Sequence, residues 1–297
     1  MTAPEFGIVI PACDEEECIG VVLEELLRMV GVEKFAIAVG VNGSTDSTAG
    51  IAARFPVSVA ETRERGYGFG CQAAIDLLER TLPPLRGYIF FAGDGASDPA
   101  DIPALVQCHE GGSTFVLGTR TRQPGNWPVM SIAHVMANVA LGGWCAALTG
   151  KWFTDLGPLR LIDRSLFHKL ALREMTFGWT IEAQVGAAVL GAQITEVRVR
   201  ERPRIAGRQK VSRVAWRRTF TIACEIVAAG WRARKRSGVP PAFEPKQSAG
   251  EFVTWGAGPA SLTADAGAVS PDHRSSPSFR LRLAVPSAPT DVGSRCI

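Results

Sequence analysis

The feature that most constrains the fold is an alternation of short apolar runs with longer amphipathic segments over residues 6–118. Runs with the length and β-branched content of buried strands occur at 6–10, 35–41, 57–59, 87–92 and 115–117. Segments with helical spacing or capping signals lie between them at 19–30, 47–55, 66–82 and 102–108. This alternation predicts an α/β, Rossmann-like fold, a mostly parallel sheet with helices on both faces.

Polar residues follow successive strands of this predicted sheet. They are Asp14 and Glu15, Asn42 and Asp46, Asp94 and Asp98, and Arg120. The carboxyl ends of parallel strands meet at one edge, where open α/β sheets bind ligands, so these exits predict a site. We expect Pro11 to end the first strand, and the acidic residues 14–17 to lie mostly in the first turn of the following helix. Asp98 is expected to cap a turn.

The pattern of the second half of the chain indicates further helices and strands, followed by a tail. Helices are expected at 132–149, 165–172 (capped by Asp163), 181–190 and 212–234, and strands at 159–162 and 194–199. Residues 237–297 are rich in Pro, Ser, Gly and Ala without periodicity, which is typical of a disordered tail. We therefore expect a domain at 1–211, a basic amphipathic helix at 212–236 and a tail at 237–297.

Positive charge is concentrated in one segment. The net charge is only +3, but residues 198–236 hold thirteen Lys and Arg against Glu201 and Glu225, a local charge of +11. Such asymmetry indicates an anionic partner, whether phosphate, nucleic acid or an acidic membrane surface. Nucleic acid fits less well, because stacking aromatics are not interleaved and the strand exits are acidic. The helix at 212–234 leaves two readings open, packing on the domain or lying in a membrane interface.

The cysteines and apolar segments bear on location. Seven scattered cysteines without a CxxC pair predict neither a disulfide framework nor a zinc site, and they fit a reducing cytoplasm. The first apolar run is too short for a signal peptide. We expect no membrane span, since no segment offers eighteen apolar residues in a row. The expected location is the cytoplasm, with peripheral contact at the membrane if the basic helix is interfacial.

Five motifs, in order, resemble those of family-2 glycosyltransferases with the GT-A fold. Residues 8–16 (IVIPACDEE) resemble V-I-P-A-Y-N-E-E, and residues 42–48 (NGSTDST) resemble D-D-G-S-T-D-G-T. Residues 92–99 (AGDGASDP) resemble the D-x-D region D-A-D-G-Q-H-D-P, and Gly118-Thr119-Arg120 resembles G-S-R. Residues 204–212 resemble the R-x-G-x-S-K-x-S loop of polyprenyl-phosphate (dolichol-phosphate) mannosyl- and glucosyltransferases. The resemblance covers about residues 6–235.

The resemblance implies inverting transfer of a hexose from a nucleotide-sugar, GDP- or UDP-linked. It places Pro11, Cys13, Glu15, Asn42 and Arg120 at the nucleotide-sugar, and Gly93 and Asp94 at the diphosphate. It also implies a divalent metal, Mg²⁺ or Mn²⁺, on Asp94, and donor or acceptor phosphate on Arg204 and Lys210. Ala92 replaces the first D-x-D carboxylate and Ala96 the glutamine that can join the metal shell, so metal binding is expected to be weak.

The acceptor leaves alternatives open. A polyprenyl phosphate is already an anionic nucleophile and needs no general base, whereas a soluble hydroxyl acceptor needs a carboxylate to take its proton. Glu182, where relatives carry an acidic residue, is then the candidate base, with Asp155 as its rival; an ordinary first-turn glutamate is an equal reading of Glu182. A catalytically silent nucleotide-sugar-binding protein is the third possibility, because of Ala92.

Overall fold

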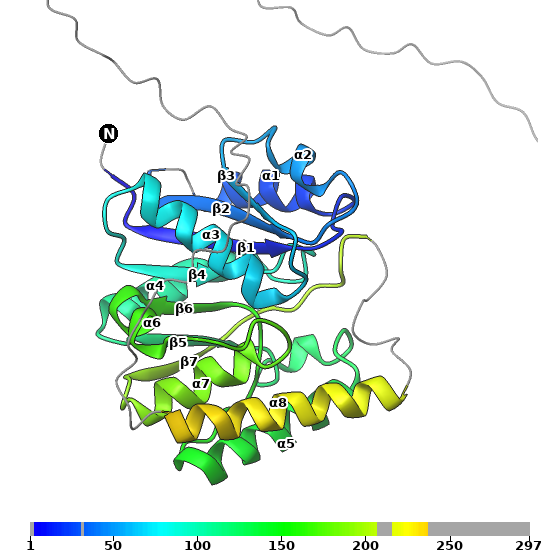
Figure 1. Ribbon diagram of the computed structural model, residues 1–297, viewed down its shortest axis with the longest axis vertical. Coiled ribbons are helices and arrows are strands. Elements are labelled where there is room, and N and C mark those ends of the chain that lie inside the picture. Colours follow the sequence, from blue (N-terminus) through cyan, green and yellow to red (C-terminus); the bar gives the residue numbers. More distant parts are fainter. Residues whose placement is uncertain (1–2, 31–32, 207–215, 237–297) are drawn as a thin grey trace, which may run out of the picture. The chain divides into compact units, whose positions relative to one another are not determined.

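The computed structural model describes residues 3–30, 33–206 and 216–236 (Figure 1). The predicted tail at 237–297 and the predicted phosphate ligand Lys210 lie outside the described residues. The strands are β1 (Phe6–Ala12), β2 (Phe35–Asn42), β3 (Ser58–Thr62), β4 (Gly87–Phe90), β5 (Phe115–Thr119), β6 (Arg160–Asp163) and β7 (Ile194–Arg198). The α-helices are α1 (Ile19–Val30), α2 (Thr48–Ala52), α3 (Tyr67–Thr81), α4 (Ile102–Glu110), α5 (Ile132–Thr149), α6 (Arg164–Leu170), α7 (Trp179–Val189) and α8 (Trp216–Arg236). Short 3₁₀ helices are η1 (Pro99–Asp101) and η2 (Pro124–Asn126).

The strands form one mixed sheet in the order β3-β2-β1-β4-β6-β5-β7. All neighbours pair in parallel except β6, which runs antiparallel to both β4 and β5. The predicted mostly parallel α/β sheet is therefore confirmed. Because β1, β2, β4 and β5 run in one direction, the polar residues that follow them lie at one edge of the sheet.

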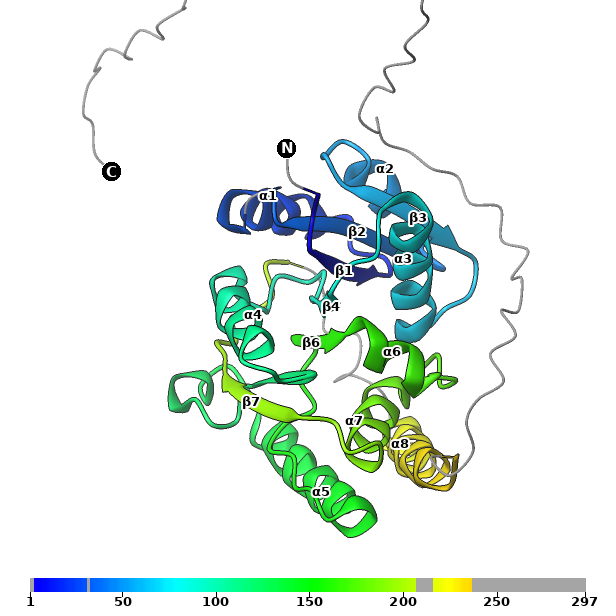
Figure 2. The same cartoon turned by 90° about the vertical axis from the view of Figure 1, so that its left-hand side faces the viewer.

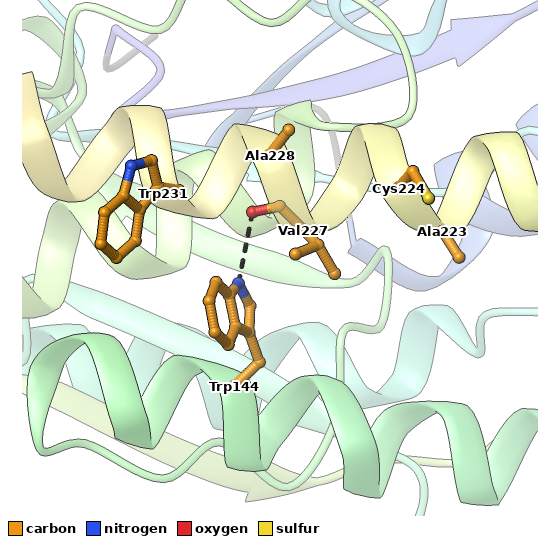
Figure 3. A pocket seen from close by; sticks show the side chains of 6 residues that line it. All are labelled: Trp144, Ala223, Cys224, Val227, Ala228 and Trp231. Atoms are coloured by element: carbon orange, nitrogen blue, oxygen red, sulfur yellow. Dashed lines mark hydrogen bonds between the residues drawn. The ribbon is translucent and has the colours of Figure 1, made fainter.

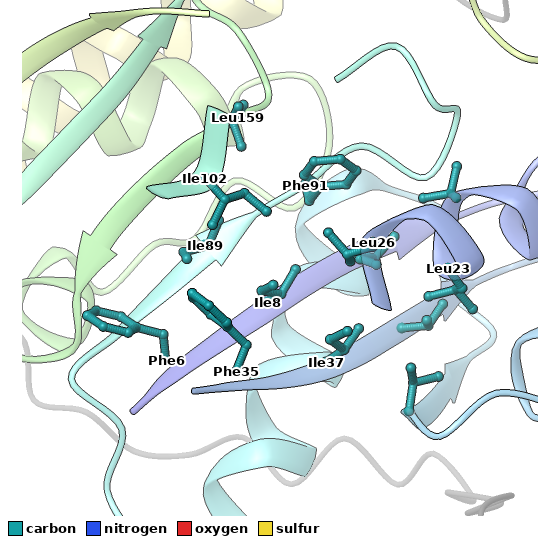
Figure 4. Packing of buried hydrophobic residues seen from close by; sticks show 14 of the residues in the cluster. Phe6, Ile8, Leu23, Leu26, Phe35, Ile37, Ile89, Phe91, Ile102 and Leu159 are labelled. Carbon is teal, nitrogen blue, oxygen red and sulfur yellow. The ribbon is translucent and has the colours of Figure 1, made fainter. Parts of the chain in front are cut away.

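Two apolar cores cover the two faces of the sheet. On β1, Phe6, Ile8 and Ile10 point to one face and pack with α1, α2 and α4, as Figure 4 shows for Phe6 and Ile8. Val9 points to the other face, which is covered by α3, α5, α6, α7 and α8. Figure 2 shows α1 and α4 on one side of the sheet and α3, α6 and α7 on the other.

Pro11 does not end the first strand, contrary to the expectation. β1 continues to Ala12, and Pro11 is in register with Gly40 of β2. Proline costs a strand its N–H donor, which matters only where a neighbour would accept it. On the other side of β1 the pairing with β4 stops at Val9. Pro11 therefore lies beyond that ladder, where the missing donor is tolerated.

The acidic cluster at residues 14–17 also behaves differently from the expectation. Helix α1 begins only at Ile19 and has no acidic residue in its first turn. The cluster instead forms the loop before the helix, and Glu16 exchanges hydrogen bonds with the next loop, accepting from the Ser47 amide at 3.0 Å and donating from its own amide to Asp46 at 3.1 Å. Two predicted caps are confirmed: Asp98 accepts from the Ala100 amide, and Asp163 accepts from two amides of α6.

Helix α5 is the one helix of the described chain that is long and apolar enough to cross a membrane, judged by length and composition alone. Its 18 residues include no Asp, Glu, Lys or Arg, and 22% of them are buried. Because His134 and Asn138 interrupt its apolar residues, this segment was not expected to span a membrane.

Candidate active site at the carboxyl edge of the sheet

The candidate site lies at β1, where the order of successive strands in the sheet reverses: β2 and β3 follow on one side of β1, and β4 lies on the other. This is the switch point at which doubly wound sheets bind ligands. A Cβ added to Gly93 would lie 3.3 Å from the Pro11 carbonyl oxygen, so the turn after β4 packs closely against the end of β1. The predicted site residues Pro11 and Gly93 are therefore neighbours.

The end of β2 packs against the first turn of α3. A Cβ added to Gly70 would lie 2.7 Å from Asn42 Oδ1 and 3.0 Å from Pro11 Cβ. Asn42 is buried, whereas Cys13 and Pro11 are half-buried. The structure thus brings Pro11 and Asn42 together under α3; their role at the nucleotide stays a prediction.

The loop after β1 is fastened to the loop after β2. Asp14 adopts a left-handed conformation (φ 51°), and its Oδ1 accepts from the Thr45 amide at 2.7 Å. Arg65 forms an ion pair with the same carboxylate. The Glu15 amide donates to Thr48 Oγ1 at 2.8 Å. These bonds fix the backbone of the loop that carries Glu15 at the edge of the site.

Arg204 joins two of the predicted site carboxylates. Its Nη2 donates to both carboxylate oxygens of Glu15, at 3.0 and 2.8 Å, and its Nη1 lies 3.3 Å from Asp94 Oδ2. The side chains of Arg204, Glu15 and Asp94 are 18%, 12% and 24% exposed. Burial alone would lower the pKa of Arg204, but the charges of Asp94 and Glu15 outweigh it and raise that pKa. Two carboxylates predicted for the donor and one cation predicted for phosphate therefore meet in one cluster.

Residues 201–206, here called the basic arm, carry Arg204 to this position. The arm runs along the turn after β4: the Arg202 amide donates to the Ala96 carbonyl at 2.8 Å, and the Ile205 amide donates to the Asp94 carbonyl at 3.3 Å. The Ile205 side chain lies directly over Gly95, where a Cβ would come within 2.3 Å of it. Gly95 also has φ +77°, so both conformation and space require glycine there.

Arg120 is engaged in a buried ion cluster. Its Nε and Nη2 each donate to Asp155 at 2.9 Å, and its backbone amide donates to the same carboxylate at 2.7 Å. Its Nη1 donates to Glu201 at 3.2 Å. Asp155 is fully buried, and burial, with Asp94 nearby, raises the pKa of Glu201. Through these hydrogen bonds, Arg120 connects β5 to the loop before β6 and to the basic arm.

Glu182, the candidate base, is 3% exposed in the first turn of α7. Its Oε2 accepts from the amides of Arg173 and Glu174 at 3.0 and 2.7 Å, and its Oε1 pairs with Arg236 of α8 at 2.6 Å. Burial raises the pKa of Glu182. Both oxygens have partners, so the described contacts are those of a residue that fastens α8 to α7.

The residues at the edge fit a divalent ion only with help from a ligand. Among the described residues no group of three or more His, Cys, Asp or Glu side chains is placed to hold a metal. Asp98 is used as a cap and pairs with Arg200 at 3.1 Å, which leaves Asp94 as the carboxylate of the D-x-D region that faces the basic arm. Mg²⁺ is commonly held by one or two carboxylates plus phosphate oxygens, and Asp94 fits that pattern.

Sequence reasoning missed the partners that position these side chains. Asp155 and Glu201 hold Arg120, and Glu25 holds Arg202 of the basic arm through two hydrogen bonds at 2.6 and 2.8 Å. Their signal is weak, because a lone carboxylate in a loop or on a helix face is ordinary. The excess of arginine over acid in 198–204 was the usable hint that buried counter-ions exist elsewhere.

Comparison with known proteins identifies the family. The family model for glycosyl transferase family 2 matches residues 7–171, more than half of the chain. The chain belongs to glycosyl transferase family 2. It is accordingly a transferase, which agrees with the resemblance drawn from its motifs. An uncharacterized glycosyltransferase of Mycobacterium tuberculosis (strain ATCC 25618 / H37Rv) is 29% identical over 215 residues, 71% of this chain and 92% of the relative.

A further relative and the solved structures extend this comparison. A dolichyl-phosphate hexose transferase of Haloferax volcanii is 28% identical over 213 residues, 71% of this glycosyltransferase and 88% of the relative. Glucosyl-3-phosphoglycerate synthase of Mycobacterium tuberculosis, solved with Mn²⁺, UDP and glucosyl-3-phosphoglycerate, has a TM-score of 0.57 at 18% identity and covers 80% and 82% of the two chains. The same enzyme solved with phosphoglyceric acid gives a TM-score of 0.57 at 17% identity, with the same coverage. At these identities the structural likeness shows the fold, and the predicted GT-A architecture is confirmed.

Proposed function

We propose that this glycosyltransferase moves a hexose from a GDP- or UDP-linked donor to a polyprenyl phosphate, working from the cytoplasm at a membrane surface. The observation that carries the proposal is the cluster of Arg204 with Glu15 and Asp94 at the strand-exit edge. A guanidinium at that position supplies bidentate contacts to a diphosphate. A relative that is a dolichyl-phosphate hexose transferase supports the choice of acceptor.

The reaction needs stabilisation of a leaving group. The bond between the anomeric carbon and the donor β-phosphate oxygen breaks, its electron pair leaves with the nucleoside diphosphate, and an acceptor phosphate oxygen forms the new bond to that carbon. Arg204 neutralises the negative charge that develops on the diphosphate. Such electrostatic stabilisation of the transition state is usually the largest contribution to catalysis. Once Arg204 contacts the diphosphate, Asp94 would be available to hold a divalent ion.

Mn²⁺ or Mg²⁺, when bound, would neutralise the diphosphate further, and Asp94 together with donor phosphate oxygens would hold it. The Mn²⁺ and UDP bound by the solved glucosyl-3-phosphoglycerate synthase support this expectation. Ala92 and Ala96 offer no ligand, so affinity for the ion depends on the donor being present.

A phosphate acceptor also suits the carboxylates of the described chain. A phosphate dianion attacks without losing a proton, so it needs no general base. Glu182 and Asp155, the two candidate bases, are buried and occupied by amides and arginines. A soluble hydroxyl acceptor is the second candidate function, supported by the phosphoglyceric acid bound to the solved synthase.

Radioactive transfer from the donor tests the proposal. The full chain is incubated with labelled UDP-glucose or GDP-mannose, Mn²⁺ and detergent-solubilised undecaprenyl phosphate, and label is counted in the organic phase. We expect label there, none with undecaprenol, and a loss of about 100-fold in kcat/KM for Arg204→Gln. The control Arg28→Gln removes a surface ion pair whose arginine side chain is 66% exposed, and it should leave the rate unchanged.

Three outcomes contradict the proposal. Label in water-soluble products with 3-phosphoglycerate, and none in lipid, replaces the acceptor with the soluble candidate. Equal label with undecaprenol and undecaprenyl phosphate removes the role of the acceptor phosphate. An Arg204→Gln variant with the wild-type rate removes the observation on which the proposal rests.

A further inference from the structure

Helix α5 exposes an apolar surface that the fold does not use. Its C-terminal half packs against the domain, with Cys145 and Leu148 in the core that contains α7 and α8. Its N-terminal half is largely uncovered: Ile132 is 83% exposed, Met136 62% and Val139 45%. A helix buried on one short stretch and apolar elsewhere indicates an unpartnered face.

Exposed apolar residues also occur in the segments before and after α5 and on α8, which packs against α5. Trp127 and Val129 precede the helix, Trp152 follows it, and α8 adds Val227 and Trp231, all exposed. Most of the exposed large hydrophobic residues in the described part of the chain belong to this surface, here called the α5–α8 face. It comprises Trp127, Val129, Ile132, Met136, Val139, Trp152, Val227 and Trp231. Single exposed apolar residues are ordinary, but a cluster of this kind marks an interaction site.

A shallow apolar groove joins the two helices. The Trp144 indole N–H donates to the Val227 carbonyl at 3.3 Å, and the Trp144 and Trp231 rings stack with centroids 6.5 Å apart (Figure 3). The groove is lined by Trp144, Ala223, Cys224, Val227, Ala228 and Trp231. Tryptophan is the residue that favours the boundary between water and lipid, because its ring is apolar and its N–H is polar.

Cations flank the α5–α8 face and acids are scarce on it. Lys151 follows α5, and Arg234 and Lys235 lie in the last turn of α8, all exposed; the Lys235 ammonium lies 5.3 Å from the Trp231 ring centroid. Arg232, also exposed, pairs with Glu174 at 2.6 Å. No Asp or Glu occurs from residue 123 to 154, and Glu225 is the acid of α8. Apolar side chains with Trp and a cationic border are the combination that binds an anionic bilayer surface.

The packing of α5 distinguishes lying on a bilayer from crossing it. A Cβ added to Gly142 would come within 2.1 Å of the Phe153 carbonyl oxygen, so the middle of α5 is pressed against the chain of the domain. Asn138 Oδ1 accepts from the Leu156 amide at 3.1 Å. A helix held in this way cannot enter the bilayer core without leaving the domain. A second copy of the chain fits less well, because the same cations would face each other.

We propose that the α5–α8 face docks this glycosyltransferase on an anionic lipid bilayer, with the apolar side chains of α5 at the level of the headgroups. Docking shares with the proposed function only the presence of a membrane, since the binding needs neither donor nor sugar transfer. The partner is the lipid surface itself.

Vesicle sedimentation with the full chain tests the proposal. Vesicles of phosphatidylcholine alone are compared with vesicles in which about a third of the lipid is phosphatidylglycerol. We expect binding to the anionic vesicles that is at least tenfold tighter and that weakens in high salt, as polybasic contacts do. The pair Ile132→Ser with Met136→Ser weakens it at least fivefold, and Lys151→Gln with Lys235→Gln about tenfold.

The chain offers a matched control on α1. Val21 and Met29 are 50% and 52% exposed, so Val21→Ser with Met29→Ser removes the same kind of surface elsewhere and leaves binding unchanged. Equal loss in this control, or equal binding to neutral and anionic vesicles, overturns the proposal. A stable dimer in sedimentation velocity that Ile132→Ser with Met136→Ser dissociates assigns the face to a second copy instead, and also overturns it.

Failure of docking is distinguishable from failure of the proposed function. A short-chain, water-soluble polyprenyl phosphate needs no bilayer, so Ile132→Ser with Met136→Ser retains wild-type transfer to it. If Arg204→Gln loses transfer to this soluble acceptor but still binds vesicles, the defect lies in sugar transfer and not in docking.

Discussion

At the scale of single residues, the candidate site depends on one arginine and the carboxylates around it. Arg204 pairs with both Glu15 and Asp94, and its single positive charge reduces the repulsion between the two carboxylates. Ala92 stands where the D-x-D motif that this segment resembles has its first carboxylate. Position 92 is half-buried, two residues after the end of β4 and two residues before Asp94.

Ala92→Asp tests whether that position limits metal binding. A second carboxylate beside Asp94 increases the charge of the site, so we expect the Mn²⁺ concentration for half-maximal transfer to fall about tenfold. Titration of Mn²⁺ at fixed donor concentration measures it. In the double variant with Asp94→Asn the gain should vanish. A gain that persists there would mean that position 92 acts without Asp94.

The residues at the strand exits were predictable from the sequence, whereas the counter-ions around them were not. Asp94 and Asn42 follow strands whose apolar patterns are clear, so their place at one edge follows from topology. Arg120 was predicted for the nucleotide, yet its partner Asp155 is 35 residues away, in a loop before a strand of four residues. No local pattern reveals such a contact, because it depends on β6 pairing antiparallel between β4 and β5.

At the scale of elements, the Arg120 cluster joins β5 to the basic arm. The variant Asp155→Asn tests how much this cluster contributes to the stability of the fold. Removing one partner of a buried ion pair leaves the other charge uncompensated, so we expect a loss of about 3 kcal/mol in the free energy of unfolding. Urea denaturation at pH 7 measures it. Glu24→Gln, which removes an exposed pair on α1, is the control and should change little. Similar small effects in both variants would refute a structural role for the cluster.

Helix α8 is joined to α7 by a buried carboxylate, and this predicts a pH dependence. Burial raises the pKa of Glu182 above its ordinary value of 4.5, so the folded chain holds that proton more tightly than the unfolded chain. The contribution of Glu182 to stability therefore falls as pH rises from about that value through the raised pKa. Glu182→Gln has no titrating group at this position, so the stability of the variant relative to wild type should increase as pH rises from 4.5 through the raised pKa.

Urea denaturation at several pH values measures this difference, in which titrations common to both proteins cancel. The side-chain carbonyl of the substituted glutamine can still accept from the amides of Arg173 and Glu174, so α7 keeps its start. A relative stability independent of pH would show that Glu182 titrates alike in the folded and unfolded chains. The sequence could not supply this prediction, since a glutamate in the first turn of a helix is ordinarily exposed.

At the scale of the whole molecule, the chemistry and the docking surface occupy different parts of one domain. The strand exits of β1, β2 and β4 form the candidate site, while α5 and α8 lie together beyond β7 (Figures 1 and 2). The described part of the basic segment is divided between these two places, because Arg204 pairs with the acidic strand exits whereas Arg234 and Lys235 lie in the last turn of α8. Composition predicted an anionic partner; which side chains would meet it became visible only with the packing of α5.

The pairing of Arg204 with two carboxylates has a consequence for the selectivity of the site toward small anions. Inorganic phosphate can offer Arg204 new contacts, but it brings nothing to compensate Glu15 and Asp94 for the lost guanidinium. A diphosphate that arrives with its own divalent cation does both, because the cation takes over the charge that Arg204 gives up. On the proposed function, the ion cluster would therefore disfavour the binding of free phosphate and favour the metal complex of the nucleotide-sugar.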